Sequence, residues 1–115
     1  MPSLSIRVDL GPDASIGPGK VRLLELIAET GSISAAARAM GMSYRRGWLL
    51  IDDLKTVFNG PLVETTAGGA KGGGARLTAK GEQVLAGFRA LERQAASATA
   101  RELHLIVALI EDAPR

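Results

Sequence analysis

The stretch from residue 32 to residue 54 constrains the fold more than any other part of this 115-residue chain. Its first half, Ser-Ile-Ser-Ala-Ala-Ala-Arg-Ala-Met-Gly, is rich in alanine, and Ser34 is placed to cap a short helix that Gly41 closes in a left-handed conformation. Helix starts again almost at once, because Ser43 is a second capping residue. The alanines are small enough to let the two helices cross closely. The pattern predicts two helices joined by a tight turn.

The helix after Ser43 carries one buried stripe, since Gly47, Ile51, Leu54 and Phe58 follow at helical spacing. Trp48 lies beside that stripe, so we interpret it as a core anchor in preference to a base-stacking residue. An earlier amphipathic helix is predicted from Lys20 to Thr30, with Gly31 as its stop. A supporting helix followed by two helices around a short turn is the helix-turn-helix arrangement.

A glycine-rich stretch, Thr66-Ala-Gly-Gly-Ala-Lys-Gly-Gly-Gly-Ala-Arg76, comes next and allows three interpretations. A phosphate loop is excluded, because Lys71 is followed by glycine where serine or threonine is required. A linker fits poorly, since strand-like residues flank the stretch at 62–66 and 75–78. The remaining interpretation is a hairpin tip, or wing, in which Lys71 and Arg76 carry the charge. We expect Gly68 to Gly74 to be the most mobile internal segment without DNA.

The two ends of the chain complete the expected fold. Residues 4 to 10 alternate apolar and polar side chains, which predicts a strand ended by Gly11 and Pro12. Thr78 is expected to cap a long last helix, whereas the apolar run from 103 to 110 fits either a buried helix or a strand. So much apolar surface exceeds the needs of a small domain, so we predict that it packs against a second subunit.

The fold class is mainly α with a small β-hairpin wing, a winged helix-turn-helix with a long C-terminal dimerisation helix. One domain spans 1–115, divided into an N-terminal strand and loop (1–17), a winged-helix core (18–78) and a dimerisation segment (79–115).

Composition excludes several classes of function. There is no cysteine and only one histidine, His104, so we expect no metal site, and we predict no cofactor. No signal peptide or membrane span is recognisable, which favours a cytoplasmic protein without a membrane partner. Asp52 and Asp53 point about 100° apart on their helix and form no catalytic pair, so we expect that the protein is not an enzyme.

The charge is distributed unevenly along the chain. Seven basic side chains face three acidic ones between residues 32 and 80, a net charge of +4, whereas each flanking region carries −1. An excess of this kind in the middle of a balanced domain is typical of a polyanion-binding surface. Tyr44, Arg45 and Arg46 fall in the first turn of the second helix of the motif, the end that enters the major groove. Arginine at a helix start is unfavourable next to the positive end of the dipole, and DNA would offset that cost.

The run from Gly31 to Leu54, followed by 62–78, resembles the N-terminal DNA-binding domain of ModE-type molybdate-responsive transcriptional regulators, and more distantly the LysR-type winged helices. The resemblance covers roughly residues 18 to 91. It implies a homodimeric bacterial regulator that reads a palindromic operator in double-stranded DNA. The family's recognition positions fall on Ser43, Tyr44, Arg45 and Arg46, and its wing on 68–76. Full-length members continue into molybdate-binding modules after the long helix, so molybdate sensing is not carried over.

The candidate DNA-binding residues are therefore Ser34, Ser43, Tyr44, Arg45, Arg46, Lys71 and Arg76. Two alternatives remain open at this point. One is a winged-helix module that binds proteins and not DNA, because fold does not fix function. The other is a small sensor that binds molybdate or a similar oxyanion at its dimer interface.

Overall fold

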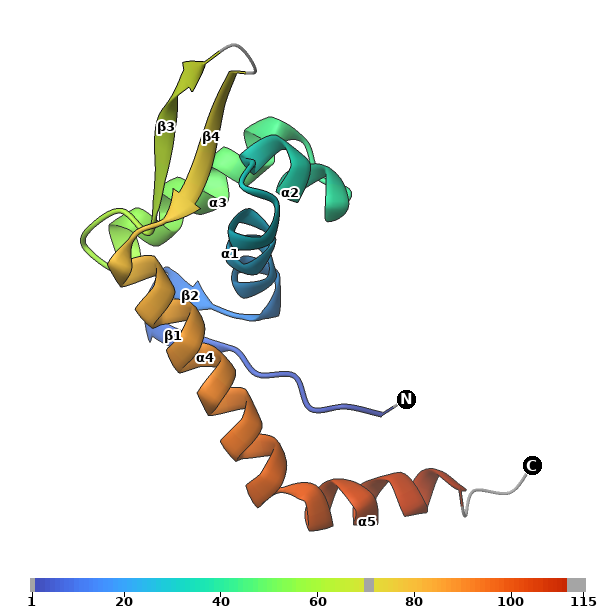
Figure 1. The fold of residues 1–115 in the computed structure, drawn as a ribbon. Helices are drawn as coiled ribbons and strands as arrows, with labels where there is room; N and C mark the ends of the chain where they lie inside the picture. The colour runs from blue at the N-terminus through green and yellow to red at the C-terminus, as the bar shows by residue number, and fades with distance from the viewer. Residues whose placement is uncertain (1, 70–71, 112–115) are drawn as a thin grey trace.

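The computed structural model describes residues 2–69 and 72–111, which form a mainly helical chain with two small antiparallel hairpins (Figure 1). The elements in chain order are β1 (Val8–Gly11), β2 (Ala14–Ile16), α1 (Pro18–Thr30), α2 (Ile33–Ala39), α3 (Tyr44–Val57), β3 (Val63–Gly69), β4 (Gly72–Leu77), α4 (Ala79–Ala98) and α5 (Ala100–Glu111). The predicted fold class is confirmed: α2 and α3 form the helix-turn-helix, and the β3–β4 hairpin is the wing.

The N-terminal strand differs from its prediction. In place of one strand over residues 4–10, β1 begins at Val8 and pairs antiparallel with β2, a strand that we did not predict. Gly11 is the last residue of β1 and lies opposite Ala14, and Pro12 and Asp13 form the turn between the two strands. The chain therefore folds back directly after Gly11, and Ile16 at the end of β2 is buried in the core.

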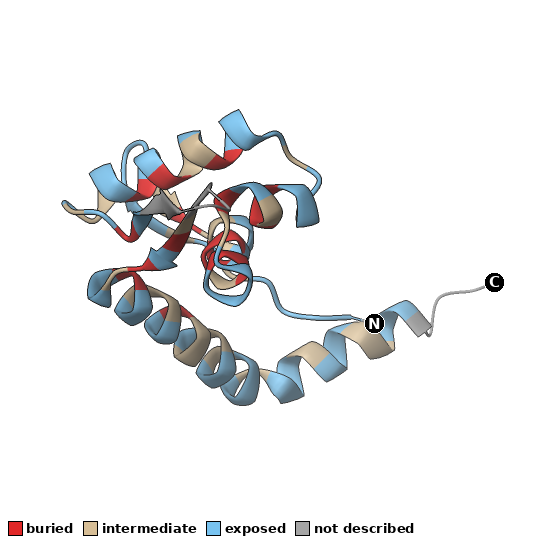
Figure 2. Cartoon of the chain, turned by 45° about the horizontal axis from the view of Figure 1, so that its top comes forward, coloured by how far each residue is buried: buried red, intermediate tan, exposed pale blue. Residues whose placement is uncertain are grey.

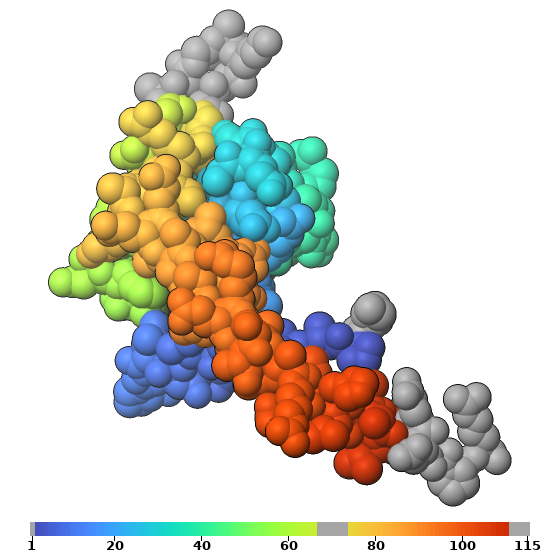
Figure 3. All heavy atoms as spheres, turned by 60° about the horizontal axis from the view of Figure 1, so that its bottom comes forward, coloured from blue at the N-terminus to red at the C-terminus, as the bar shows by residue number. Residues whose placement is uncertain are grey.

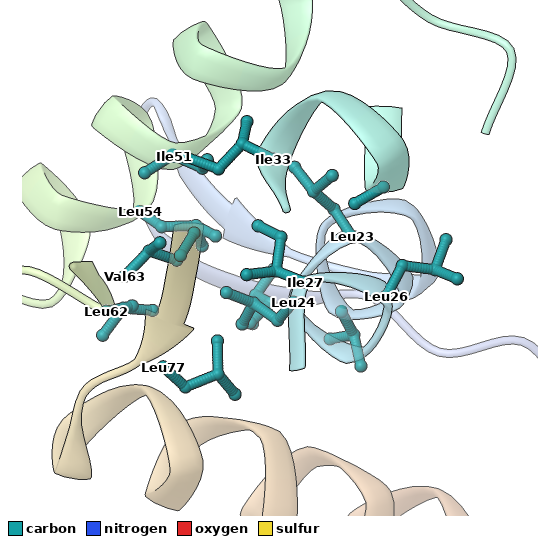
Figure 4. Packing of buried hydrophobic residues seen from close by; sticks show 14 of the residues in the cluster. Leu23, Leu24, Leu26, Ile27, Ile33, Ile51, Leu54, Leu62, Val63 and Leu77 are labelled. Atoms are coloured by element: carbon teal, nitrogen blue, oxygen red, sulfur yellow. The ribbon is translucent and has the colours of Figure 1, made fainter. Parts of the chain in front are cut away.

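Helix α1 is the centre of the core (Figure 4). It begins at Pro18, two residues before the predicted start, because proline fits the first turn of a helix. Gly31 ends it with a left-handed φ of 68°, and its N–H donates to the carbonyl of Ile27 at 2.8 Å. Helix α1 packs against α2, α4 and β4. Its buried side chains are Val21, Leu23, Leu24, Leu26 and Ile27.

The wing is fixed at its base to the start of α4. The Thr78 hydroxyl accepts a hydrogen bond from the Gly81 N–H at 3.0 Å, which confirms the predicted cap. The Thr78 N–H donates to the carbonyl of Leu62 at 2.9 Å, next to the first residue of β3. Gly81 is buried against this carbonyl, so closely that a Cβ at position 81 would overlap the Leu62 oxygen. The start of α4 is therefore held in direct contact with the root of the wing.

An ion-pair network joins α1 to α4. The Arg89 guanidinium contacts the Glu25 carboxylate at 3.0 Å and the Glu92 carboxylate at 2.8 Å, and Arg22 donates a hydrogen bond to Glu25. The hydrogen bond from Arg22, together with the positive charge of Arg89, lowers the pKa of Glu25 below its ordinary value. Glu25 is thus held as a carboxylate between two arginines.

The C-terminal region forms two helices, α4 and α5, where we predicted one long helix followed by a segment of undecided structure. Thr99 stands between them, and both its N–H and its hydroxyl bond back to the carbonyl of Ala95. Helix α5 points away from the rest of the chain and carries mostly exposed side chains (Figure 2). Seen from below, α5 projects beyond the body of the domain (Figure 3). Within the ranges 2–69 and 72–111, no helix is both long and apolar enough to cross a membrane.

Candidate nucleic-acid interface

The cap of α2 lies two residues before the predicted position. Ser32, not Ser34, is the N-cap, because its backbone is extended and its hydroxyl accepts from the N–H of Ala35 at 3.0 Å. Ile33 is the first helical residue and is buried, so the helix must start early enough to place this side chain in the core. Ser34 is consequently an exposed residue of the first turn, with its hydroxyl 3.3 Å from that of Ser32.

The turn between α2 and α3 follows the prediction. Gly41 has a left-handed φ of 69°, and the Met42 N–H donates to the carbonyl of Ala37 at 3.0 Å. Ser43 then caps α3, since its hydroxyl accepts from the N–H of Arg46 at 3.0 Å. Gly47 is buried where the helices cross, and a Cβ at that position would lie 3.3 Å from the Cβ of Ala37. Small residues on both helices therefore set their separation.

The first turn of α3 presents Tyr44, Arg45 and Arg46 to solvent. The turn contains no acidic residue, and neither arginine forms an ion pair with any residue in the described parts of the chain. Two cations thus stand beside the positive end of the helix dipole without a carboxylate to balance them. An anionic partner would remove this unfavourable arrangement.

The outward face of α3 includes one residue that the sequence interpretation missed. Leu49 lies four residues after Arg45 and is 52% exposed, although leucine is normally buried. The buried residues of the helix are Gly47, Ile51 and Leu54. The signal was available in the sequence, because Leu49 lies off that stripe. An exposed leucine of this kind can contact the methyl group of thymine.

Trp48 lies between the core and the surface. It is half-buried and packs against the core, as predicted, and its ring meets that of Tyr44 edge-on at a centroid distance of 6.2 Å. Tyr44 itself is 54% exposed. The tryptophan ring therefore packs against the ring of an exposed tyrosine.

One of the two basic side chains predicted to contact DNA from the wing is already engaged in an ion pair. Arg76 pairs with Glu64 directly across the hairpin, with Nε and Oε1 2.7 Å apart. Its neighbour Ala75 is buried, so the exposed Arg76 occupies the opposite face of the hairpin. Lys71 lies outside the described residues, as do parts of the 68–74 stretch for which we predicted high mobility. Both remain predictions.

A hollow of about 270 Å³ separates the start of the helix-turn-helix from the wing. The Thr66 hydroxyl, on its wing side, accepts from the N–H of Gly74 at 2.9 Å. The structure thereby brings Ser34 and Tyr44 together with the wing, but it does not bring Arg76 to the same surface. The polar side chains that line the hollow are Ser32, Ser34, Tyr44, Thr65 and Thr66.

Two basic residues of the positive middle region lie at the other end of α3, one in its last turn and one at the start of α4. Lys80 donates to the carbonyl of Phe58 at 2.8 Å, which satisfies the end of that helix, and Lys55 lies in its last turn. The residues that leave positive charge near the start of α3 are Arg38, Arg45 and Arg46, all of them exposed. Three of the seven basic side chains of the region therefore lie at or close to the turn of the helix-turn-helix.

A family model and two curated relatives place the chain among bacterial helix-turn-helix regulators. The model for "Bacterial regulatory helix-turn-helix protein, lysR family" matches residues 19–82. The chain is 46% identical over 77 residues to the molybdenum-pterin-binding protein MopA of Rhodobacter capsulatus, covering 67% of this chain and 29% of that protein. It is also 46% identical over 72 residues to the molybdenum transport protein ModE of Herbaspirillum seropedicae, covering 63% of this chain and 27% of that one. The expected resemblance to ModE-type regulators is confirmed.

A solved structure extends the comparison to the fold. The crystal structure of the CbnR_DBD–DNA complex superimposes with a TM-score of 0.60 at 22% identity, over 76% of this chain and 95% of the other. At that identity the likeness concerns the fold alone. The chain spans less than a third of the length of the two curated relatives described above.

Proposed function

The chain belongs to the LysR family of bacterial regulatory helix-turn-helix proteins, and we propose that it is a sequence-specific DNA-binding transcriptional regulator that acts as a homodimer. One observation carries the proposal: the first turn of α3, beside a wing, exposes Arg45 and Arg46, and no carboxylate in the described part of the chain pairs with either of them. This arrangement suits insertion of a helix start into the major groove. The proposed role is regulatory and not enzymatic, and it is exercised in the cytoplasm, where bacterial DNA is found.

The outer face of α3 reads the bases. Arg45 or Arg46 forks onto O6 and N7 of a guanine, a contact that only the major groove offers. Leu49, one turn further along, contacts a thymine methyl group in the same groove. These residues therefore determine which operator sequence the protein prefers.

The hollow between α2 and the wing holds the DNA backbone. The hydroxyls of Ser34, Tyr44 and Thr65 line it and can donate to phosphate oxygens without reading sequence. Ser43 acts indirectly, because its hydroxyl is used to cap α3. The phosphate contacts fix the register in which α3 enters the groove.

The wing adds contacts to the backbone or the minor groove. Lys71 follows β3 in the sequence and supplies positive charge, and the glycines around it allow the backbone to approach phosphates closely. Arg76 is paired with Glu64 on the other face of the hairpin and can contact a phosphate only if the phosphate displaces Glu64, so we expect the smaller effect from this residue.

A homodimer presents two such surfaces to a palindromic operator, with half-sites about one helical turn apart. Two copies make roughly 6 to 10 phosphate contacts, so affinity falls steeply as the salt concentration rises. Segment 79–115 is the proposed dimerisation segment. A role in molybdate sensing is not part of the proposal.

The test uses an operator selected from genomic DNA fragments and a scrambled sequence of equal length. The double variant Arg45→Ala/Arg46→Ala should lose the preference for the operator, whereas Lys71→Ala should weaken binding to both DNAs and reduce the salt slope by about one. Lys55→Ala, at the far end of α3, is the matched control and should bind like the parent chain.

Normal operator preference in the double arginine variant would refute the assignment of α3. Equal, weak binding of the parent chain to both DNAs would favour a protein-interaction module on the same scaffold.

A further inference from the structure

Helix α5 presents an apolar face to solvent. Four large side chains of this helix, at positions i, i+1, i+4 and i+5, share one side of it. Their exposed fractions range from 53% to 70%, whereas leucine and isoleucine are normally buried. We call this surface the C-terminal arm; it consists of Leu105, Ile106, Leu109 and Ile110.

An apolar groove lies between the β1–β2 hairpin and the middle of α4. Its volume is about 200 Å³, and Gln83 is the only polar side chain among the residues that line it. Leu10 and Leu91 on its rim are 45% and 40% exposed. The residues that form this apolar groove include Val8, Leu10, Phe58, Val84, Phe88 and Leu91.

The arm cannot reach the groove of its own chain. Helix α4 has 20 residues and is therefore about 30 Å long, and the groove lies beside its middle while the arm begins beyond its end. The Thr99 N–H bonds to the carbonyl of Ala95 at the end of α4, and the Leu103 N–H bonds to that of Thr99 at the start of α5, so Thr99 is bonded to both helices. These bonds hold α5 pointing away from the body (Figure 1).

The surface of the isolated chain is too large for a compact monomer. It exposes 7837 Å², whereas a folded monomer of 12.0 kDa exposes about 6,000 Å². The radius of gyration is 17.3 Å, against about 13 Å for a compact chain of this length. The excess of about 1,800 Å² lies in the range that each subunit of an obligate dimer buries, roughly 1,000 to 2,500 Å². A second copy of this chain supplies an occupant of the required size.

We propose that the C-terminal arm of each subunit docks in the apolar groove of its partner, so that two copies exchange α5 reciprocally around a two-fold axis. Both surfaces are apolar and belong to the same chain, and a two-fold axis buries two identical arm–groove contacts at once. This inference rests on the homodimer of the proposed function and specifies its interface. The exchange also ties β1–β2 of one subunit to α5 of the other.

The absence of cysteine from the chain permits a clean cross-linking test. Leu10→Cys chains are mixed with Leu109→Cys chains, allowed to exchange subunits, and oxidised mildly without DNA. We expect a disulfide-linked heterodimer in the mixture and none in either variant alone. Leu49→Cys, at an exposed leucine on α3, is the matched control and should not link to Leu109→Cys.

Light scattering on the same chain separates this proposal from the proposed function. The parent should have twice the chain mass of 12.0 kDa, and Leu109→Lys/Ile110→Lys should weaken dimerisation roughly a hundredfold or more while the helical circular dichroism persists. A dimer in which Leu109→Cys links only to itself would overturn the arm–groove contact and leave the homodimer intact. A monomeric parent would overturn both, and neither result depends on DNA binding.

Discussion

Two glycines of α4 should respond to the same substitution with opposite signs. Gly81→Ala places a methyl group where the carbonyl oxygen of Leu62 lies, and that oxygen also accepts the hydrogen bond from the Thr78 N–H. Gly87→Ala, six residues further along the same helix, places its methyl group in open space with no atom within 4 Å. The pair tests whether the root of the wing is locked to α4.

The expected magnitudes follow from these surroundings. Alanine in place of an exposed helical glycine raises the free energy of unfolding by about 0.5 to 1 kcal/mol, which is the prediction for Gly87→Ala. At position 81 the same gain is opposed by an overpacking cost of about 1 to 3 kcal/mol and by about 0.5 to 1.5 kcal/mol for the weakened hydrogen bond. The net prediction for Gly81→Ala is a loss of about 0.5 to 4 kcal/mol.

Urea unfolding followed by circular dichroism measures both values. The unfolding measurements are made in the Leu109→Lys/Ile110→Lys background, because Gly87 lines the apolar groove and the arm of a partner would otherwise meet the added methyl group. Gly81→Ala should also bind operator DNA more weakly, since the displaced Leu62 precedes β3 of the wing. Equal stabilisation by the two substitutions would refute the close contact between α4 and the wing root.

Two further predictions concern caps and ion pairs. Ser32→Ala should cost about 1 kcal/mol of unfolding free energy through loss of the α2 cap, whereas Ser34→Ala should leave stability unchanged and weaken DNA binding; urea titration with parallel binding measurements checks this, and the reverse order of stabilities would contradict the cap assignment. Because the pKa of Glu25 is lowered in the folded chain, its carboxylate stabilises the fold at pH values above the ordinary pKa of 4.5. This contribution is lost as the pH falls through the lowered pKa. Glu25→Gln should therefore reduce stability at pH 7 and flatten its decline at acidic pH, and parallel stability–pH curves for the two proteins would exclude that role.

Local chemistry explains why much of the fold could be predicted from the sequence. Gly31 and Gly41 take left-handed conformations, and Ser43 and Thr78 cap helices, because each acts on its immediate backbone neighbours. The hairpin wing followed from strand-like residues on both sides of the glycines. The exposed first turn of α3 with Arg45 and Arg46 was predicted in the same way.

The remaining features depend on contacts that a local pattern does not contain. Ser32 and Ser34 are equally good caps, and only the burial of Ile33 selects between them. The Gly11-Pro12 pair fits both the end of a single strand and the start of a hairpin turn. The burial of Ile16 in the core favours the hairpin, because it holds the second strand against the domain. The pairing of Arg76 with Glu64 likewise requires the strand register, which no spacing in the sequence reveals.

The function of the interface is tested most directly by a hydroxyl-radical footprint of the purified chain on fragments of its own genome at physiological salt. We predict a discrete protected site with two-fold symmetry, in which two half-sites about one helical turn apart are protected, and loss of that site in Arg45→Ala/Arg46→Ala. Protection spread evenly over all fragments, or an unchanged footprint in the double variant, would contradict it.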